Sequence, residues 1–268
     1  MKRWIKISLS GLFAIGVTIL GMSIRSHMAE QLVPEPEIIV RVEGENAFIT
    51  GEEFLEHLRR ERLFFAGQKR NQLKTAAIEA YIAGISQVKK VEVFQRIDGS
   101  WKIDIEMRQP VARIFNLYGE SFYLDSEGNT FHTIPSHTAR VLVFTGEIID
   151  RLNSISVQEI INNDSLKSIR KLDDIYRISD YVCNDPVFHS LIGQVHLKKN
   201  GDFVLIPLVG DQKIIFGSAY SEKEVKEKFQ KLKVFYKEAI PYEGWNTYTE
   251  ISLKYRDQIV CKKKKTDE

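Results

Sequence analysis

The side chains of this chain that could do chemistry are its histidines, cysteines and carboxylates. His132 and His137 lie five residues apart in a loop-like stretch, and His189 and His196 lie seven apart around a predicted strand. Either pair could in principle bind zinc, but no further cysteine or histidine completes the four ligands of a structural site. The spacing therefore favours solvated loop and surface histidines, and we expect no metal site.

An acidic segment at 125–129, Asp-Ser-Glu-Gly-Asn, superficially resembles a calcium loop. It lacks the bidentate glutamate at the twelfth position and the flanking helices that such a loop needs. A hairpin turn explains its aspartate, glycine and asparagine more simply. The acidic pair Asp173 and Asp174 falls on a predicted helix, where we expect it to form a solvated face.

Several well-known catalytic motifs are absent from the sequence. It has no Gly-x-Ser-x-Gly elbow, no glycine-rich phosphate loop, no His-Glu-x-x-His and no paired Cys-x-x-Cys. Its 38 basic and 36 acidic residues nearly balance, so the chain sets up no broad field for nucleic acid. We therefore expect no enzyme activity, no cofactor, no small-molecule substrate and no nucleic-acid partner.

The elements that position these residues begin with an uncharged apolar run at 7–24. Its 18 residues would rise about 27 Å as a helix, close to the roughly 30 Å of a membrane's hydrocarbon core. Lys2, Arg3 and Lys6 precede the run and predict a cytoplasmic N-terminus. We favour an uncleaved transmembrane anchor over a signal peptide, because the run is longer than a typical signal core and no Ala-x-Ala site follows it.

After a cytoplasmic tail at 1–6 and this anchor, a proline-containing linker at 25–37 leads into a first folded segment at 38–108. The Thr-x-x-Glu spacing from Thr50 is typical of a helix start, and Asp-Gly between two alternating runs is typical of a hairpin turn. The predicted elements are a strand at 38–42, a helix after Thr50, a helix at 71–83 and a hairpin turning at Asp98-Gly99.

The segment 109–260 is predicted to be a second, strand-rich domain with helices, and 261–268 a basic and polar tail. The fold class is therefore α+β: a single N-terminal transmembrane helix, a β-α-α-β-β domain, and a mixed β-rich domain with helices. The elements predicted in the second domain are strands at 111–116, 122–125, 141–144, 195–198, 203–208, 213–216 and 249–260, and helices at 165–181 and after Ser221.

Three strings give this organisation a family resemblance. They are 106–112 (Glu-Met-Arg-Gln-Pro-Val-Ala), 123–131 (Tyr-Leu-Asp-Ser-Glu-Gly-Asn-Thr-Phe) and 251–255 (Ile-Ser-Leu-Lys-Tyr). Their order and spacing resemble landmarks of the FtsQ/DivIB family of bacterial cell-division proteins. The third string departs from the family pattern, with serine in place of aspartate and lysine in place of arginine. The resemblance implies that 38–108 is a POTRA domain and 109–260 the family's C-terminal β domain.

The last predicted strand supplies a means of binding. If it lies at the edge of its sheet, its backbone from Arg256 to Val260 is unpaired and can accept another chain's strand. In the family this end of the β domain captures the FtsB/FtsL pair, so the resemblance implies a contact here, with Tyr255 as the aromatic anchor. The predicted partner-binding residues are Tyr255, Arg256, Asp257, Gln258, Ile259 and Val260.

The function that the resemblance implies is a non-catalytic scaffold of the divisome, single-pass in the cell inner membrane, with its bulk in the periplasm at the septum. It would link early division proteins to the septal cell-wall synthases by binding FtsB/FtsL. One alternative is a POTRA-containing component of protein translocation or outer-membrane assembly, and another is an extracytoplasmic cell-wall hydrolase. Cys183 and Cys261 could form a disulfide in that compartment, although we favour two free cysteines. The lysine run 262–265 favours a solubilising tail over a lipid contact.

Overall fold

The computed structural model describes residues 15–20, 22, 29–42, 49–96, 98–134, 137–153 and 155–264. The described chain divides after Met107 into two compact units. The first contains the described residues up to Met107, and the second contains those from Arg108 onward.

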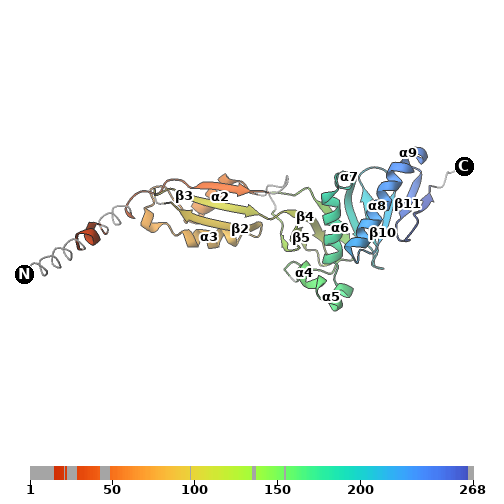
Figure 1. Ribbon diagram of the computed structural model, residues 1–268, viewed down its shortest axis with the longest axis horizontal. Helices are drawn as coiled ribbons and strands as arrows, with labels where there is room; N and C mark the ends of the chain where they lie inside the picture. Colours follow the sequence, from red (N-terminus) through yellow and green to blue (C-terminus); the bar gives the residue numbers. More distant parts are fainter. Residues whose placement is uncertain are drawn as a thin grey trace, which may run out of the picture. The chain divides into compact units, whose positions relative to one another are not determined.

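In the first unit two helices pack on a three-stranded sheet (Figure 1). The strand order is β1-β3-β2, with β1 parallel and β2 antiparallel to the central strand. The elements are β1 (Glu37–Arg41), α2 (Gly51–Arg60), the short 3-10 helix η1 (Arg70–Gln72), α3 (Thr75–Ala83), β2 (Val88–Gln95) and β3 (Trp101–Met107).

Local sequence signals set the boundaries of these elements. Thr50 caps α2: the backbone N–H of Glu53 donates to its hydroxyl at 3.2 Å, and its own N–H donates to the Glu53 carboxylate at 2.7 Å. Gly99 turns the chain between β2 and β3 at φ +91°, where only glycine is free of strain. The predicted order of strand, two helices and two strands is the order observed. The name POTRA for this unit remains a prediction.

The second unit is built on a nine-stranded mixed sheet, with strand order β12-β11-β10-β9-β8-β7-β4-β5-β6. Its strands are β4 (Pro110–Phe115), β5 (Ser121–Asp125), β6 (Thr130–His132), β7 (Leu142–Gly146), β8 (Ile192–Leu197), β9 (Phe203–Pro207), β10 (Lys213–Gly217), β11 (Tyr248–Ser252) and β12 (Val260–Lys263). Its helices are α4 (Val157–Ile161), α5 (Asp164–Ile169), α6 (Leu172–Asn184), α7 (Pro186–Leu191), α8 (Glu222–Glu238) and α9 (Ile240–Glu243).

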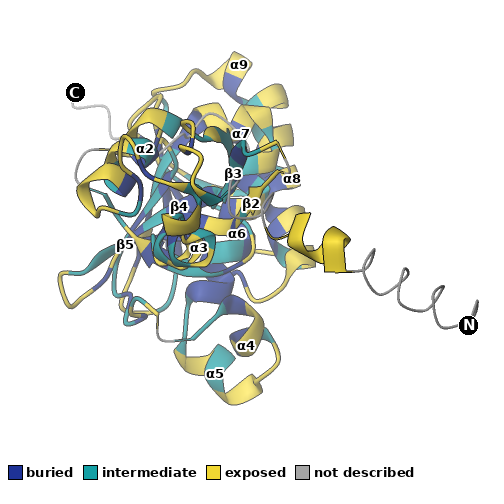
Figure 2. Cartoon of the chain, turned by 90° about the vertical axis from the view of Figure 1, so that its left-hand side faces the viewer, coloured by how far each residue is buried: buried dark blue, intermediate teal, exposed yellow. Residues whose placement is uncertain are grey.

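An aromatic cluster joins α6, α7 and α8 to the sheet. The rings of Tyr181 and Phe229 stack with centroids 4.6 Å apart, and Phe188 and Phe216 lie 4.8 and 5.0 Å from Phe229. Phe188, Phe216 and Phe229 are fully buried, and full burial of such a side chain contributes about 1.5–3 kcal/mol. The buried residues gather where helices meet strands, while α5 buries none of its residues (Figure 2). The cluster therefore fixes α8 to the sheet near the end at which β12 is the outermost strand.

The structure does not support the predicted transmembrane helix at 7–24, and that prediction is wrong for the described residues. No helix of the described residues is long and apolar enough to cross a membrane. The helical residues described in that run are 15–20 and 22. The rest of 7–24 lies outside the described residues. The described residues therefore form an α+β fold with a large mixed sheet, and none of their helices is the expected membrane-spanning element.

In the second unit, one predicted helix and one predicted strand are each observed as two separate elements. The helix expected at 165–181 is two helices, because Arg170 is extended at ψ 158° and ends α5 before α6 begins. The strand expected at 249–260 ends at Ser252, and β12 begins at Val260 and continues to Lys263, into the segment predicted to be a tail. The intervening residues form a loop, which carries most of the predicted site.

Candidate functional site

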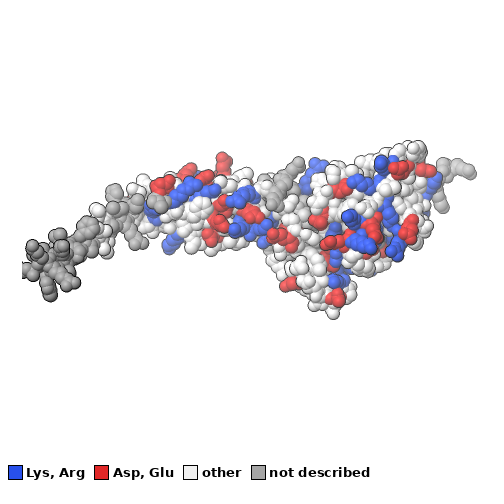
Figure 3. Space-filling view, in the orientation of Figure 1, with Lys and Arg blue, Asp and Glu red and all other residues white. Residues whose placement is uncertain are grey.

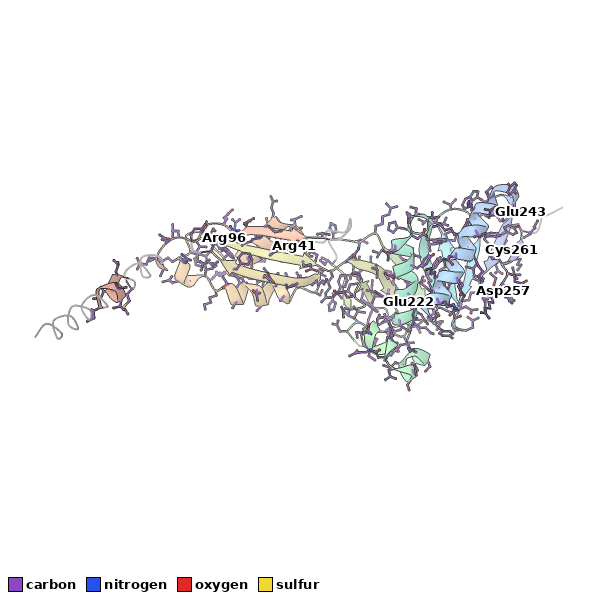
Figure 4. The ribbon with its side chains drawn as sticks, viewed as in Figure 1. Arg41, Arg96, Glu222, Glu243, Asp257 and Cys261 are labelled. Atoms are coloured by element: carbon purple, nitrogen blue, oxygen red, sulfur yellow. The ribbon has the colours of Figure 1, made fainter. Side chains whose placement is uncertain are left out.

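The candidate site lies at the β12 end of the nine-stranded sheet. β12 pairs antiparallel with β11, with Cys261 opposite Ile251 and Val260 opposite Ser252. Among the described residues no strand lies on its other side. Figure 4 labels Asp257, Cys261 and Glu243, which all lie at this end of the unit. The open edge that the binding hypothesis requires is present among the described residues, but the strand that forms it, β12, begins later than expected.

The predicted site residues have different positions around this edge. Tyr255, Arg256 and Asp257 form a bend in the loop between β11 and β12, and only Val260 belongs to β12. Tyr255 is 52% exposed and Val260 44% exposed. Ile259 instead packs against the core cluster. The exposed tyrosine is free to contact another chain, whereas Ile259 has mainly a packing role.

A groove beside the edge was not predicted. It has a volume of about 800 Å³ and lies between one face of α8 and the loop residues 256–259. Val234, Phe235, Ala239 and Ile259 form its apolar part. The polar residues that line it are Glu227, Gln230, Lys231, Glu238, Arg256, Asp257 and Gln258. Val234 is 60% exposed on α8, and no local pattern in the sequence marks it as part of a groove.

Lys231 connects α8 to the loop. Its ammonium donates to the carbonyls of Leu253 at 3.3 Å and Arg256 at 3.1 Å, and also to that of Tyr255. Burial, together with the nearby positive charge of Lys228, lowers the pKa of Lys231 below its ordinary value. One side chain of α8 thus holds three carbonyls at the point where the chain leaves β11.

The lysines near the C-terminal end of β12 are paired rather than free. Lys263 forms an ion pair with Glu243 at 3.0 Å, and Lys264 forms one with Asp211 at 2.9 Å. Acidic and basic residues are interspersed on the face shown in Figure 3, in keeping with the formal charge of +2. Cys261, expected next to a tail, lies within β12, and both it and Cys183 are free thiols.

The other candidate chemistry does not assemble into a site. No group of three or more His, Cys, Asp or Glu side chains among the described residues could hold a metal ion. A second hollow, of about 280 Å³, contains Cys183 and His189. Burial raises the pKa of the Cys183 thiol to about 11, so the reactive thiolate is scarce at neutral pH. His196 contacts the Thr145 hydroxyl through Nδ1 at 3.2 Å on an exposed part of the sheet.

The acidic pair on α6 is buried, contrary to the expected solvated face. Asp173 and Asp174 are each 2% exposed. Arg177, one turn later, donates to both carboxylates and to the carbonyl of Ala219, at 2.8 Å to Asp174 and 2.7 Å to Ala219. Burial is the main cause that raises the pKa of Asp174. This network joins α6 to the loop before α8, and so supports the helix that lines the groove.

The fold and the site together define a class of protein: an α+β protein in which the last strand of the large sheet, β12, has no described neighbour on one side and lies next to a groove. The chain belongs to the FtsQ/DivIB family. A family model described as "FtsQ/DivIB, C-terminal related" matches residues 109–262, which include the whole sheet up to β12. No curated protein matches the chain.

Membership of this family confirms the predicted resemblance and gives the chain a role in cell division. It also indicates a location at the division site, with other division proteins as partners. Proteins of this family are generally non-enzymatic.

Proposed function

We propose that this chain is a non-catalytic scaffold of the divisome that binds the FtsB/FtsL pair through the open edge of β12 and the groove beside it. By holding that pair, the chain links early division proteins to septal cell-wall synthesis. The observation that carries the proposal is the edge of β12, which no described strand covers, next to a groove whose apolar part is formed by Val234, Phe235, Ala239 and Ile259. Strand addition to such an edge is a general mode of peptide recognition, in which backbone bonds give affinity and side-chain pockets give specificity.

The hydrogen bonds of β12 indicate which backbone groups face the open edge. The carbonyl of Lys262 accepts from the Thr249 hydroxyl at 3.1 Å, and the N–H of Lys264 donates to the Thr247 carbonyl at 2.9 Å. Both residues therefore point their backbone toward β11. Because alternate residues of a strand point their backbone groups to opposite sides, Cys261 and Lys263 present theirs to the open edge. An added strand can pair with the N–H and the carbonyl of each.

The groove suits the side chains of such an added strand. Side chains of successive strand residues alternate between the two faces of a sheet. Ile259 and Cys261 pack against the core cluster, which places them on the face that α8 covers. Side chains of the added strand that point to this face meet the groove, where the exposed Val234 offers apolar surface. Tyr255 supplies an exposed aromatic ring nearby. Tyrosine is enriched among the residues that contribute most of the binding energy at protein interfaces.

The proposal is tested by Lys263→Pro, with Lys263→Ala as its matched control. Proline removes the N–H that faces the open edge, and proline is tolerated in edge strands at such positions. Both variants lose the ion pair with Glu243, so the difference between their affinities reports the loss of the backbone N–H alone. We expect Lys263→Pro to bind the host's FtsB/FtsL pair about tenfold more weakly than Lys263→Ala, which corresponds to one lost hydrogen bond of roughly 1.4 kcal/mol.

Affinities are measured by calorimetry on the purified pair, and the same variants are expressed in host cells depleted of the wild-type protein. Lys263→Ala should restore division, and Lys263→Pro should leave long undivided cells. Equal affinities for the two variants would remove the edge of β12 from the binding site.

A further inference from the structure

The loop between β11 and β12 has few attachments of its own. Leu253 still donates its N–H to the Ile215 carbonyl at 2.9 Å, in continuation of β11. Beyond it, residues 254–259 make no backbone–backbone hydrogen bond with any other described residue. Lys254 forms an exposed ion pair with Asp202 at 2.8 Å, and such pairs contribute little. Ile259 packs against the core at the far end of the loop.

Lys231 provides the polar attachment between these two ends. An ammonium has three donors, and here they meet the carbonyls of Leu253, Tyr255 and Arg256. Hydrogen bonds from a charged donor are stronger than neutral ones. The lysine lies on α8, which the aromatic cluster around Phe229 fixes to the sheet. The position of the loop is therefore set from a rigid helix and not by the loop's own sequence.

From this arrangement we propose that Lys231 is a positioning residue of the partner-binding site. It holds the backbone of 253–256 so that the Tyr255 side chain points outward and β12 enters the sheet in the observed register. It also fixes the loop wall of the groove, which it lines together with Arg256. This inference rests on the proposed function, because it assigns a role within the same site.

The effect on binding follows from the cost of ordering a loop. Ordering flexible groups at an interface opposes association, and groups that are already fixed in the bound conformation avoid that cost. Without the ammonium, the three carbonyls bond to water and the bend at Tyr255 samples other conformations. The loop is at the surface and Lys231 is only partly buried, so its loss changes the site more than the stability of the unit.

The experiment compares Lys231→Met, which keeps the length and removes the donors, with Lys231→Arg, which keeps charged donors. Lys226→Met is the control, because Lys226 is exposed on the same helix and contributes no contact to the loop. We expect Lys231→Met to bind the host's FtsB/FtsL pair about tenfold more weakly. Lys231→Arg should recover most of that affinity, and Lys226→Met should match the wild type. Thermal unfolding of each full-length variant separates loss of fold from loss of the site.

Amide hydrogen exchange of 253–263 in the free protein supplies a readout that needs no partner. Faster exchange there in Lys231→Met, with the rest of the second unit unchanged, supports the positioning role. Wild-type affinity in Lys231→Met, or unchanged exchange of the loop, overturns it. If the wild type does not bind the FtsB/FtsL pair, the proposed function fails, and the exchange experiment alone then decides whether Lys231 holds the loop. Should Lys231→Met fail to fold, Lys231→Gln, too short to reach the carbonyls, replaces it in both measurements.

Discussion

Replacement of Arg177 by methionine should be the most destabilising of the changes considered for the second unit. The Arg177 side chain is 7% exposed, and its two carboxylate partners, Asp173 and Asp174, are 2% exposed. Methionine has a similar length but no donors, so the two carboxylates and the Ala219 carbonyl lose a shared partner. Breaking a buried ion pair by removing one partner costs about 3–5 kcal/mol. This is a large part of a typical total stability of about 5–15 kcal/mol.

The cost should depend on pH in a definite direction. Burial already raises the pKa of Asp174 in the wild type, and loss of the guanidinium raises it further in the variant. A carboxyl group whose folded-state pKa is raised contributes stability below its unfolded pKa, and that contribution is lost as pH rises through the folded pKa. The difference in unfolding free energy between wild type and Arg177→Met should therefore be largest near pH 7 and should shrink toward pH 4.

Urea unfolding at several pH values, followed by circular dichroism, measures this difference. Lys167→Met is the control, because Lys167 pairs with the fully exposed carboxylate of Asp164 and such surface pairs contribute about 0–1 kcal/mol. A loss below about 1 kcal/mol for Arg177→Met at pH 7 would contradict the reasoning, since it is no more than a surface pair contributes. So would a loss at pH 4 as large as that at pH 7.

Two further changes test other parts of the second unit. Asp150 is fully buried and burial raises its pKa; the carboxylate oxygen without a hydrogen-bond partner among the described residues lies 4.0 Å from a guanidinium nitrogen of Arg170. Asp150→Asn can still accept the Lys171 N–H and should raise the unfolding free energy by about 1 kcal/mol at pH 7. Because the wild-type carboxyl is protonated at low pH, this gain in unfolding free energy should vanish below pH ~4. Urea unfolding of both proteins at the two pH values measures the gain. Tyr255→Ala should weaken binding of FtsB/FtsL by at least about tenfold with an unchanged melting temperature, since the ring is 52% exposed; unaltered affinity in calorimetry would exclude it as an anchor.

Short-range signals in the sequence predicted much of the fold. The capping residues Thr50 and Ser221 begin helices as expected, and Asp98-Gly99 turns the hairpin. Each signal works because the interacting atoms lie within a few residues of one another. The open edge at the β12 end of the sheet was a condition of the binding hypothesis, and local signals in the sequence do not decide it.

The missed features depend on residues far apart in the sequence. The alternation of Ile251, Leu253 and Tyr255 predicts a strand that continues past Ser252, but β11 ends there. The carbonyls that follow accept from Lys231, which lies on another element. Asp173 and Asp174 resemble a solvated helix face, but Arg177 and the Ala219 carbonyl allow their burial. The groove needs α8 and the 256–259 loop side by side, which no local pattern encodes. The apolar run at 7–24 predicted a membrane span from composition alone, and the described helices contain none.

The most direct test of the proposed edge-strand site is amide hydrogen exchange by NMR along β12, with and without the host's FtsB/FtsL pair. In the free protein, Lys262 and Lys264 point their backbone toward β11, whereas Cys261 and Lys263 face the open edge. Strand addition predicts that binding slows exchange at Cys261 and Lys263 strongly and changes it little at Lys262 and Lys264. Binding of the pair with no added protection at Cys261 and Lys263 would contradict strand addition and place the contact elsewhere on the molecule.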